Sequence, residues 1–239
     1  MSCSPTRISA TPRAARRISS VANVTRRKLQ QGDADTALME LVKAIAAGDT
    51  AAACRLIAAS PTLAIACFEK GATRKDAKPY YLDEIGYYVF VGDTALHITA
   101  ANYRRDLARK LIGAGANVHA RNRRGAEPLH AAAVGAPGSR TWNPRAQAAI
   151  ITQLIAAGAD PNAIDNNGVT PLHRAIRTRC AAAVKALIEG GADVRRMNHN
   201  GSTPMKLATH NTGRGGTGSQ EAKSQQQKIL QLLQQHGAR

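Results

Sequence analysis

Along the second half of the chain, apolar residues recur three or four positions apart in short stretches, which is the spacing of an amphipathic helix. Leu172 and Ala175 share one such face, and Val184, Leu187 and Ile188 share the next. Prolines and glycines separate the stretches, so the pattern predicts many short helices. Each helix alone would leave its apolar face in water, and the helices must therefore stack to be stable. The chain has no run of about 18 apolar residues, so no transmembrane helix is predicted.

The helical stretches belong to a repeat with a period of 33 residues. One motif occurs four times, at intervals of 33, 43 and 33 residues: TALH (94–97), EPLH (127–130), TPLH (170–173) and TPMK (203–206). A second motif follows each: LIGAGANV (111–118), LIAAGADP (154–161), LIEGGADV (187–194) and LLQQHGA (232–238). The longer intervals place glycine-containing insertions at 134–145 and 211–223. A fixed period of this length indicates a solenoid of repeated units.

The two motifs resemble those of the ankyrin repeat family, whose unit is a β-turn followed by two antiparallel helices. GVTPLHRAI (168–176) and AVKALIEGGADV (183–194) carry the resemblance most closely, and it covers residues 92–239 and, more weakly, 36–61. It implies an all-α fold, an α-solenoid of stacked helix-turn-helix units with β-turn fingertips. The structural positions of the motif are Thr94, Leu96, His97, Gly115, Pro128, Leu129, His130, Gly158, Thr170, Pro171, Leu172, His173, Gly191, Thr203 and Pro204.

Elementary helix chemistry supports several of these roles. The Thr170 hydroxyl can cap free N–H groups, and Pro171 suits a first helical turn, where its missing N–H is harmless. Gly158 and Gly191 follow a second helix, where a left-handed backbone is favoured. The resemblance further implies that His97, His130 and His173 join each helix start to the adjacent turn by hydrogen bonds, so we predict no metal site.

The chain therefore divides into a disordered basic tail over 1–32 and an ankyrin repeat domain over 33–239. We place the repeats at 33–66, 92–124, 125–167, 168–200 and 201–239, with atypical first and last units because the ends of a solenoid face water. A further insertion at 67–91 contains PYYLDEIGYYVF (79–90). This aromatic segment is either a cover over the seam between the first two repeats or an anchor for a partner.

By resemblance, a partner protein is expected to contact the fingertip turns and the exposed face of each first helix. The turns supply Arg121, Arg123, Arg124, Asn166, Asn167, Met197, His199 and Asn200, and the first helices supply Ile98, Asn102, Arg174 and Arg177. One flank of this surface is basic, and arginine pairs bidentately with carboxylates. We therefore predict a non-catalytic protein-interaction scaffold whose partner has an acidic surface.

The charge of the chain leaves an alternative open. Lys and Arg number 33 against 16 Asp and Glu, and residues 1–32 contain no acidic residue. Such an excess attracts acidic surfaces of any kind, so non-specific binding of nucleic acid or an anionic membrane by the tail and the arginines is the alternative function. We expect a monomer. The four cysteines form no C-x-x-C pair, which favours the reducing cytosol as its location. Organellar import through residues 1–32 is the alternative location.

Gly213, Gly215 and Gly218 spell G-x-G-x-x-G, the fingerprint of a dinucleotide site. A true fingerprint follows a strand, opens a helix and is followed by an acidic residue about 20 positions later. Here the preceding segment, 203–209, is a predicted first helix, and no acidic residue follows Glu221. We therefore interpret these glycines as a loop within the last repeat and predict no cofactor, no catalytic residue and no enzymatic activity.

Overall fold

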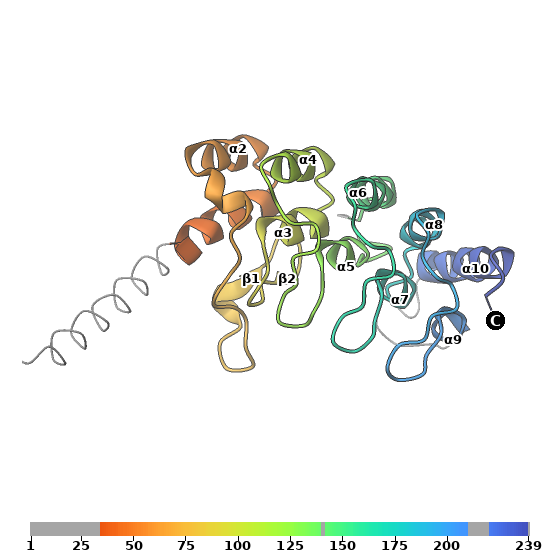
Figure 1. Ribbon diagram of the computed structural model, residues 1–239. Coiled ribbons are helices and arrows are strands. Elements are labelled where there is room, and N and C mark those ends of the chain that lie inside the picture. Colours follow the sequence, from red (N-terminus) through yellow and green to blue (C-terminus); the bar gives the residue numbers. More distant parts are fainter. Residues whose placement is uncertain (1–33, 140–141, 210–219, 239) are drawn as a thin grey trace, which may run out of the picture.

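The computed structural model describes residues 34–139, 142–209 and 220–238, which form an elongated stack of helix pairs (Figure 1). The pairs follow the chain: residues 34–46 with α2 (Thr50–Ala59), α3 (Ala95–Ala101) with α4 (Arg105–Gly113), α5 (Pro128–Ala132) with α6 (Pro144–Ala156), α7 (Pro171–Arg177) with α8 (Ala181–Glu189), and α9 (Pro204–Thr209) with α10 (Gln220–Gln235). In Figure 1, α2, α4, α6 and α8 form an outer row, and the first helices α3, α5, α7 and α9 lie below them. The predicted all-α solenoid is confirmed.

The first helices begin as their sequences predict. Pro128, Pro171 and Pro204 are the first residues of α5, α7 and α9. Thr170 caps α7, its hydroxyl accepting the N–H of His173 at 3.3 Å, and Thr94 and Glu127 hold the same position before α3 and α5. The leucines that follow, Leu96, Leu129 and Leu172, are completely buried.

The second helices end at glycines in the left-handed region. Gly115, Gly158 and Gly191 have φ angles of 95°, 98° and 94°, a conformation that side chains with a Cβ rarely adopt. This backbone reverses the chain and sends it toward the next turn.

One continuous core runs through the stack, and it is built mainly from aliphatic residues and alanine. The seams between neighbouring units bury Leu154 of α6 and Leu187 of α8, both fully inaccessible, and these two helices are in contact. Because many core positions are alanine, helices approach closely without large side chains between them.

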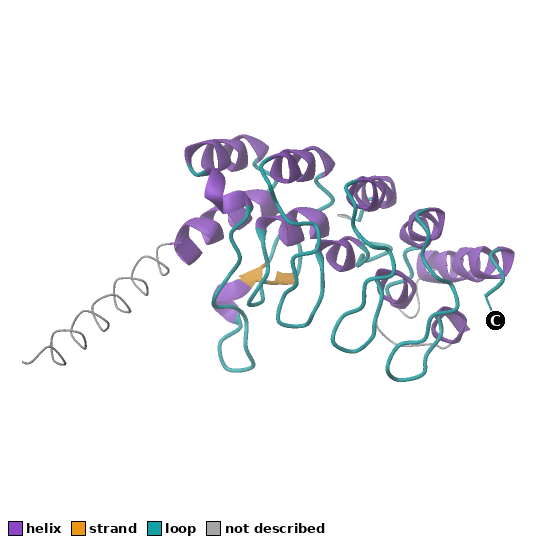
Figure 2. Ribbon diagram, viewed as in Figure 1, coloured by secondary structure: helices purple, strands orange, loops and turns teal. Residues whose placement is uncertain are grey.

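The first insertion has a structure of its own. After η1 (Pro61–Ala64), residues 67–91 contain a 3-10 turn, η2 (Lys78–Tyr80), and a hairpin of β1 (Tyr81–Leu82) and β2 (Tyr87–Tyr88), shown in orange in Figure 2. Two predicted boundaries differ from the structure, because helix α6 begins at Pro144, capped by Asn143, and α10 already begins at Gln220. The tail 1–32 and the glycines Gly213, Gly215 and Gly218 lie outside the described residues.

Candidate protein-binding surface

The turns between the repeats project from the same side of the stack and are joined edge to edge (Figure 1). The Arg123 N–H donates to the Val91 carbonyl at 2.7 Å, the Asn166 N–H to the Arg124 carbonyl at 2.9 Å, and the His199 N–H to the Asn167 carbonyl at 3.0 Å. Each fingertip turn is therefore held by the one before it, so their tips form a continuous surface with a fixed geometry.

Within each turn, one short polar side chain folds the backbone back on itself. The Asn122 Oδ1 accepts the N–H groups of Arg124 and Ala126, at 2.9 and 3.1 Å. Asp165 and Asn198 occupy the equivalent positions of the next two turns and accept backbone N–H groups in the same way. This side-chain mimic of a turn keeps the exposed residues beside it in place.

The motif histidines connect successive repeats, as the resemblance implies. The backbone N–H groups of Thr94, Glu127 and Thr170 donate to Nδ1 of His97, His130 and His173, at 3.1, 3.2 and 3.2 Å. Each Nε2 lies 3.0 to 3.1 Å from a carbonyl oxygen of the next turn, belonging to Ala126, Val169 and Ser202. A neutral ring with its proton on Nε2 satisfies both contacts. Burial lowers the pKa of all three histidines, that of His130 to about 3, so the neutral form is favoured.

Two exposed arginines of the first predicted fingertip turn lie over an aromatic ring. The guanidinium carbons of Arg123 and Arg124 are 5.0 and 4.2 Å from the centroid of Phe90. A cation over an aromatic face is attracted by the ring's negative quadrupole, which restricts the guanidinium orientation while leaving its N–H groups available. Both arginines therefore hold exposed, partly ordered guanidinium groups at a position where a partner contact was predicted.

The side chain of Arg121, from the same turn, forms hydrogen bonds that connect this turn to the next. Its Nε donates to the Gly125 carbonyl at 3.1 Å, and its Nη2 donates to the carbonyl of Ile164 in the next turn. The Asn166 amide likewise donates to the Arg123 carbonyl at 3.0 Å. Both side chains were predicted to contact a partner, and both also serve as braces between neighbouring turns.

Arg174 forms an ion pair with Asp165, at 2.9 Å between Nη2 and Oδ2, and only 22% of its side chain is exposed. Burial of Asp165 opposes its ionisation, but the Arg174 hydrogen bond and the N–H groups of Asn167 and Val169 outweigh burial and lower its pKa. Arg174 therefore stabilises the fingertip turn that contains Asp165, Asn166 and Asn167. Arg177, one turn further along α7, is half-buried.

The structure contradicts the expected exposure of Ile98, which is completely buried. The neighbouring residue Asn102 shows why: its amide donates to the carbonyls of Ile45 and Ala46, at 2.6 and 3.3 Å. The helix of residues 34–46 thus packs beside α3 and covers the face on which Ile98 lies. Ile98 belongs to the core, and Asn102 ties the first repeat to the second.

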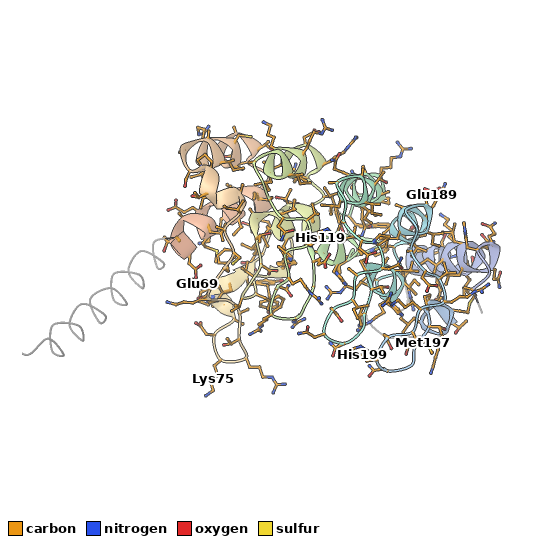
Figure 3. The ribbon with its side chains drawn as sticks, viewed as in Figure 1. Glu69, Lys75, His119, Glu189, Met197 and His199 are labelled. Carbon is orange, nitrogen blue, oxygen red and sulfur yellow. The ribbon has the colours of Figure 1, made fainter. Side chains whose placement is uncertain are left out.

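The predicted residues of the last fingertip turn are all exposed. Met197 is 63% exposed, and His199 and Asn200 are also exposed. Figure 3 shows Met197 and His199 at the end of the stack, away from the outer row of helices. With Asn167 of the preceding turn, which is also exposed, these residues extend the surface beyond the arginines.

The structure adds a fingertip that the sequence reasoning missed. Residues 67–91 form the first projecting turn, and Lys75 lies at its tip beside two further exposed cations, Arg74 and Lys78 (Figure 3). One signal was present: each of the other turns precedes a copy of the first motif (EPLH, TPLH or TPMK), and this insertion precedes the copy TALH at 94–97. The insertion is therefore an enlarged fingertip turn.

The aromatic residues of this enlarged turn divide between two roles. Tyr87 packs against the core, its hydroxyl 3.3 Å from the Asp93 carboxylate, and burial raises its pKa well above the usual value. Tyr81 and Tyr88 lie opposite each other across the hairpin with ring centroids 4.5 Å apart, and they are 36% and 45% exposed. The segment is thus partly a seam cover, and it also presents a pair of tyrosines to solvent.

Two kinds of feature are absent from the part of the chain that the structure describes. Among them, no group of three or more His, Cys, Asp and Glu side chains is placed to hold a metal ion. No described helix has both the length and the apolar character needed to cross a bilayer.

Comparison with known proteins identifies the repeats. The family model for ankyrin repeats in three copies matches residues 144–239, and the model for a single ankyrin repeat matches residues 91–123. No curated protein matches the chain. The two matched segments lie on either side of residues 124–143, which include α5, and together they cover more than half of the sequence. The chain belongs to the ankyrin repeat family.

Proposed function

We propose that this protein is a non-catalytic scaffold that binds the acidic surface of a partner protein through its fingertip turns and first helices. Ankyrin repeats generally mediate protein–protein interaction, and the chain belongs to that family. What the proposal adds is the chemical character of the partner and the part of the surface that meets it.

The observation that carries the proposal is the pair of arginines stacked on Phe90. A flexible arginine loses side-chain entropy when it binds, whereas a guanidinium already held over a ring loses less. Arg123 and Arg124 are both exposed, and their guanidinium carbons lie within 5.0 Å of the same ring centroid. Each guanidinium can therefore donate two hydrogen bonds to a carboxylate from a restricted orientation.

Charges on the other turns are mixed. The enlarged turn before the two arginines carries four exposed cations and four exposed acids: Lys70, Arg74, Lys75 and Lys78, and Glu69, Asp76, Asp83 and Glu84. Two further exposed cations, Arg195 and Arg196, lie on the last turn. Arg123 and Arg124 therefore supply the local basic charge that an acidic partner meets, and such charge raises the association rate more than the final affinity.

An affinity capture with the full chain tests the proposal. The bait carrying Arg123→Gln and Arg124→Gln is compared with wild type and with Arg105→Gln/Arg109→Gln, which removes the same charge from the outer helix α4. We expect the captured partner to associate about tenfold more slowly with the first variant, with a flatter salt dependence. Phe90→Leu keeps both charges but removes the ring, and it should weaken binding by about 1 kcal/mol.

Two outcomes contradict the proposal. Equal losses in the Arg123/Arg124 and Arg105/Arg109 variants would show that net charge alone attracts the partner. Displacement of every captured protein by generic double-stranded DNA, or its loss after nuclease treatment, would favour the electrostatic nucleic-acid function instead.

A further inference from the structure

A second candidate binding site lies on the opposite side of the molecule, between the outer helices α6, α8 and α10. Figure 1 shows α6 and α8 nearly end-on, whereas α10 runs lengthwise across the view. Helix α10 therefore crosses the direction of α6 and α8 instead of lying parallel to them. A groove of about 530 Å³ remains between the three helices, within the range of about 300–1,000 Å³ typical of ligand sites.

The floor of the groove is lined by apolar residues, most of them small. Ala148 of α6 and Ala181 and Ala182 of α8 line it on one side, and the half-buried Leu232 of α10 lies on the other. None of these side chains is long enough to fill the space between the helices. The floor therefore has room for one aliphatic side chain of a ligand.

The rim carries one cation from each helix: Arg145 from α6, Lys185 from α8 and Lys228 from α10. Among the described lining residues none is acidic. Lys185 has a partner, Glu189, at 3.7 Å, but both side chains are 62% exposed, so this pair is weak. Arg145 and Lys228 are exposed, and no ion pair links either to another described residue.

The glutamines of α10 divide the groove into a braced end and an open end. The buried Gln225 accepts the Ala181 N–H at 3.0 Å and donates to Glu221 at 2.8 Å, so it fixes α10 against the start of α8. Gln231 and Gln235 lie further along the same face and are exposed. Their amides can bond a backbone or a carboxylate.

We propose that this groove binds an acidic peptide segment of a partner protein, with carboxylates at the three cations and one aliphatic side chain on the alanine floor. The complementary charge and the short apolar floor favour a peptide over other anionic ligands. Nucleic acid is disfavoured because none of the described lining residues is aromatic, and base stacking supplies much of single-strand binding. The site is separate from the fingertip surface and does not depend on the function proposed for it.

A labelled synthetic peptide tests the site directly. The probe is a fluorescein-labelled decapeptide of glutamates with a central leucine, and its control has glutamine in place of every glutamate. Fluorescence anisotropy with the full chain measures affinity, and amide chemical-shift changes locate the contact. We expect saturable binding of the acidic peptide alone, with the shifts concentrated on α6, α8 and α10.

Matched variants separate the groove from general charge. Arg145→Gln/Lys228→Gln should weaken the peptide about fivefold, since exposed charge pairs contribute up to about 1 kcal/mol. Lys43→Gln/Arg105→Gln removes the same charge from other exposed helix positions and should change affinity less than twofold. Ala182→Leu fills the groove without altering charge and should also weaken binding, whereas Arg123→Gln/Arg124→Gln on the fingertips should not.

Each contrary result overturns the groove assignment. It fails if the acidic peptide shows no saturable binding, or if the two charge variants of the helices weaken it equally. It also fails if binding is lost only in the Arg123/Arg124 variant, a result that would leave the fingertip proposal standing. If a single-stranded oligonucleotide binds more tightly than the acidic peptide, and this binding depends on Arg145 and Lys228, the ligand of this groove is nucleic acid and the peptide proposal is wrong.

Discussion

Mild acid should destabilise the stack through the histidine that joins the third helix pair to the turn after it. The His130 Nδ1 accepts the Glu127 N–H at 3.2 Å, and its Nε2 lies 3.0 Å from the Val169 carbonyl oxygen. Protonation would convert Nδ1 from an acceptor to a donor facing another donor, and would place a charge in a fully buried site. Burial accordingly lowers the pKa of this ring to about 3.

The direction of the effect follows from proton binding. An unfolded histidine has a pKa of about 6.5, so between that pH and about 3 the unfolded chain takes up a proton that the folded chain does not. Stability is therefore complete above neutral pH and falls as the pH drops below about 6.5. At pH 5.5 the loss from His130 is roughly 1 kcal/mol, and His97 and His173 act in the same direction because burial lowers their pKa values too.

Urea denaturation at pH 7.5 and pH 5.5 measures this loss of stability. The lower pH is chosen because most carboxylates are still ionised there. The wild type is compared with His130→Gln, and with His236→Gln as a control at an exposed position. We expect His130→Gln to be less stable at pH 7.5 but to lose roughly 1 kcal/mol less than the wild type on acidification. An identical decline in all three proteins would show that His130 does not supply the pH dependence and would refute the neutral-ring assignment.

Two further predictions concern the seams and the enlarged fingertip turn. Leu154→Ala and Leu187→Ala should each lower the free energy of unfolding by about 2–5 kcal/mol in a urea titration, because both side chains are fully buried between helices; a change below about 0.5 kcal/mol at both sites would contradict the assigned register. Asp93→Ala removes the acceptor of the Phe90 N–H and of the Asn122 amide, at 2.7 and 2.9 Å, and should cost on the order of 1–3 kcal/mol for each donor left buried. It should also accelerate trypsin cleavage at residues 74–78, and an unchanged cleavage rate would show that Asp93 does not hold this turn.

The architecture was predictable from the sequence because the same helix-starting and helix-ending residues recur in each repeat. Thr170 before Pro171 begins a helix, and Gly191 ends the next one, wherever the motif occurs. The 33-residue period then fixes which apolar faces meet, so the fold followed without any knowledge of tertiary contacts.

Whether an individual surface position is exposed was less predictable, because its exposure depends on the residues that pack beside it in the folded structure. Ile98 occupies the same motif position as Arg174, directly after the histidine, yet one is buried by the first repeat and the other pairs with Asp165. Arg121 bonds the backbone carbonyls of Gly125 and Ile164, and no periodic pattern in the sequence specifies those contacts or the pairing of Arg174. Spacing identifies a helix face, but only the packed structure shows which side chains remain available.

The enlarged fingertip shows how a solenoid accepts such an addition. Each repeat contacts only its neighbours, so extra residues in a projecting turn do not disturb the seams on either side. The end of the 67–91 segment is fixed to the start of α3, because Asp93, directly before the helix cap Thr94, accepts the Phe90 N–H at 2.7 Å. Phe90 in turn lies beneath Arg123 and Arg124 of the following turn. The same insertion that lengthens the first turn thus orders the cations of the second, and disrupting Asp93 should weaken partner binding through Phe90 even though Asp93 itself is completely buried.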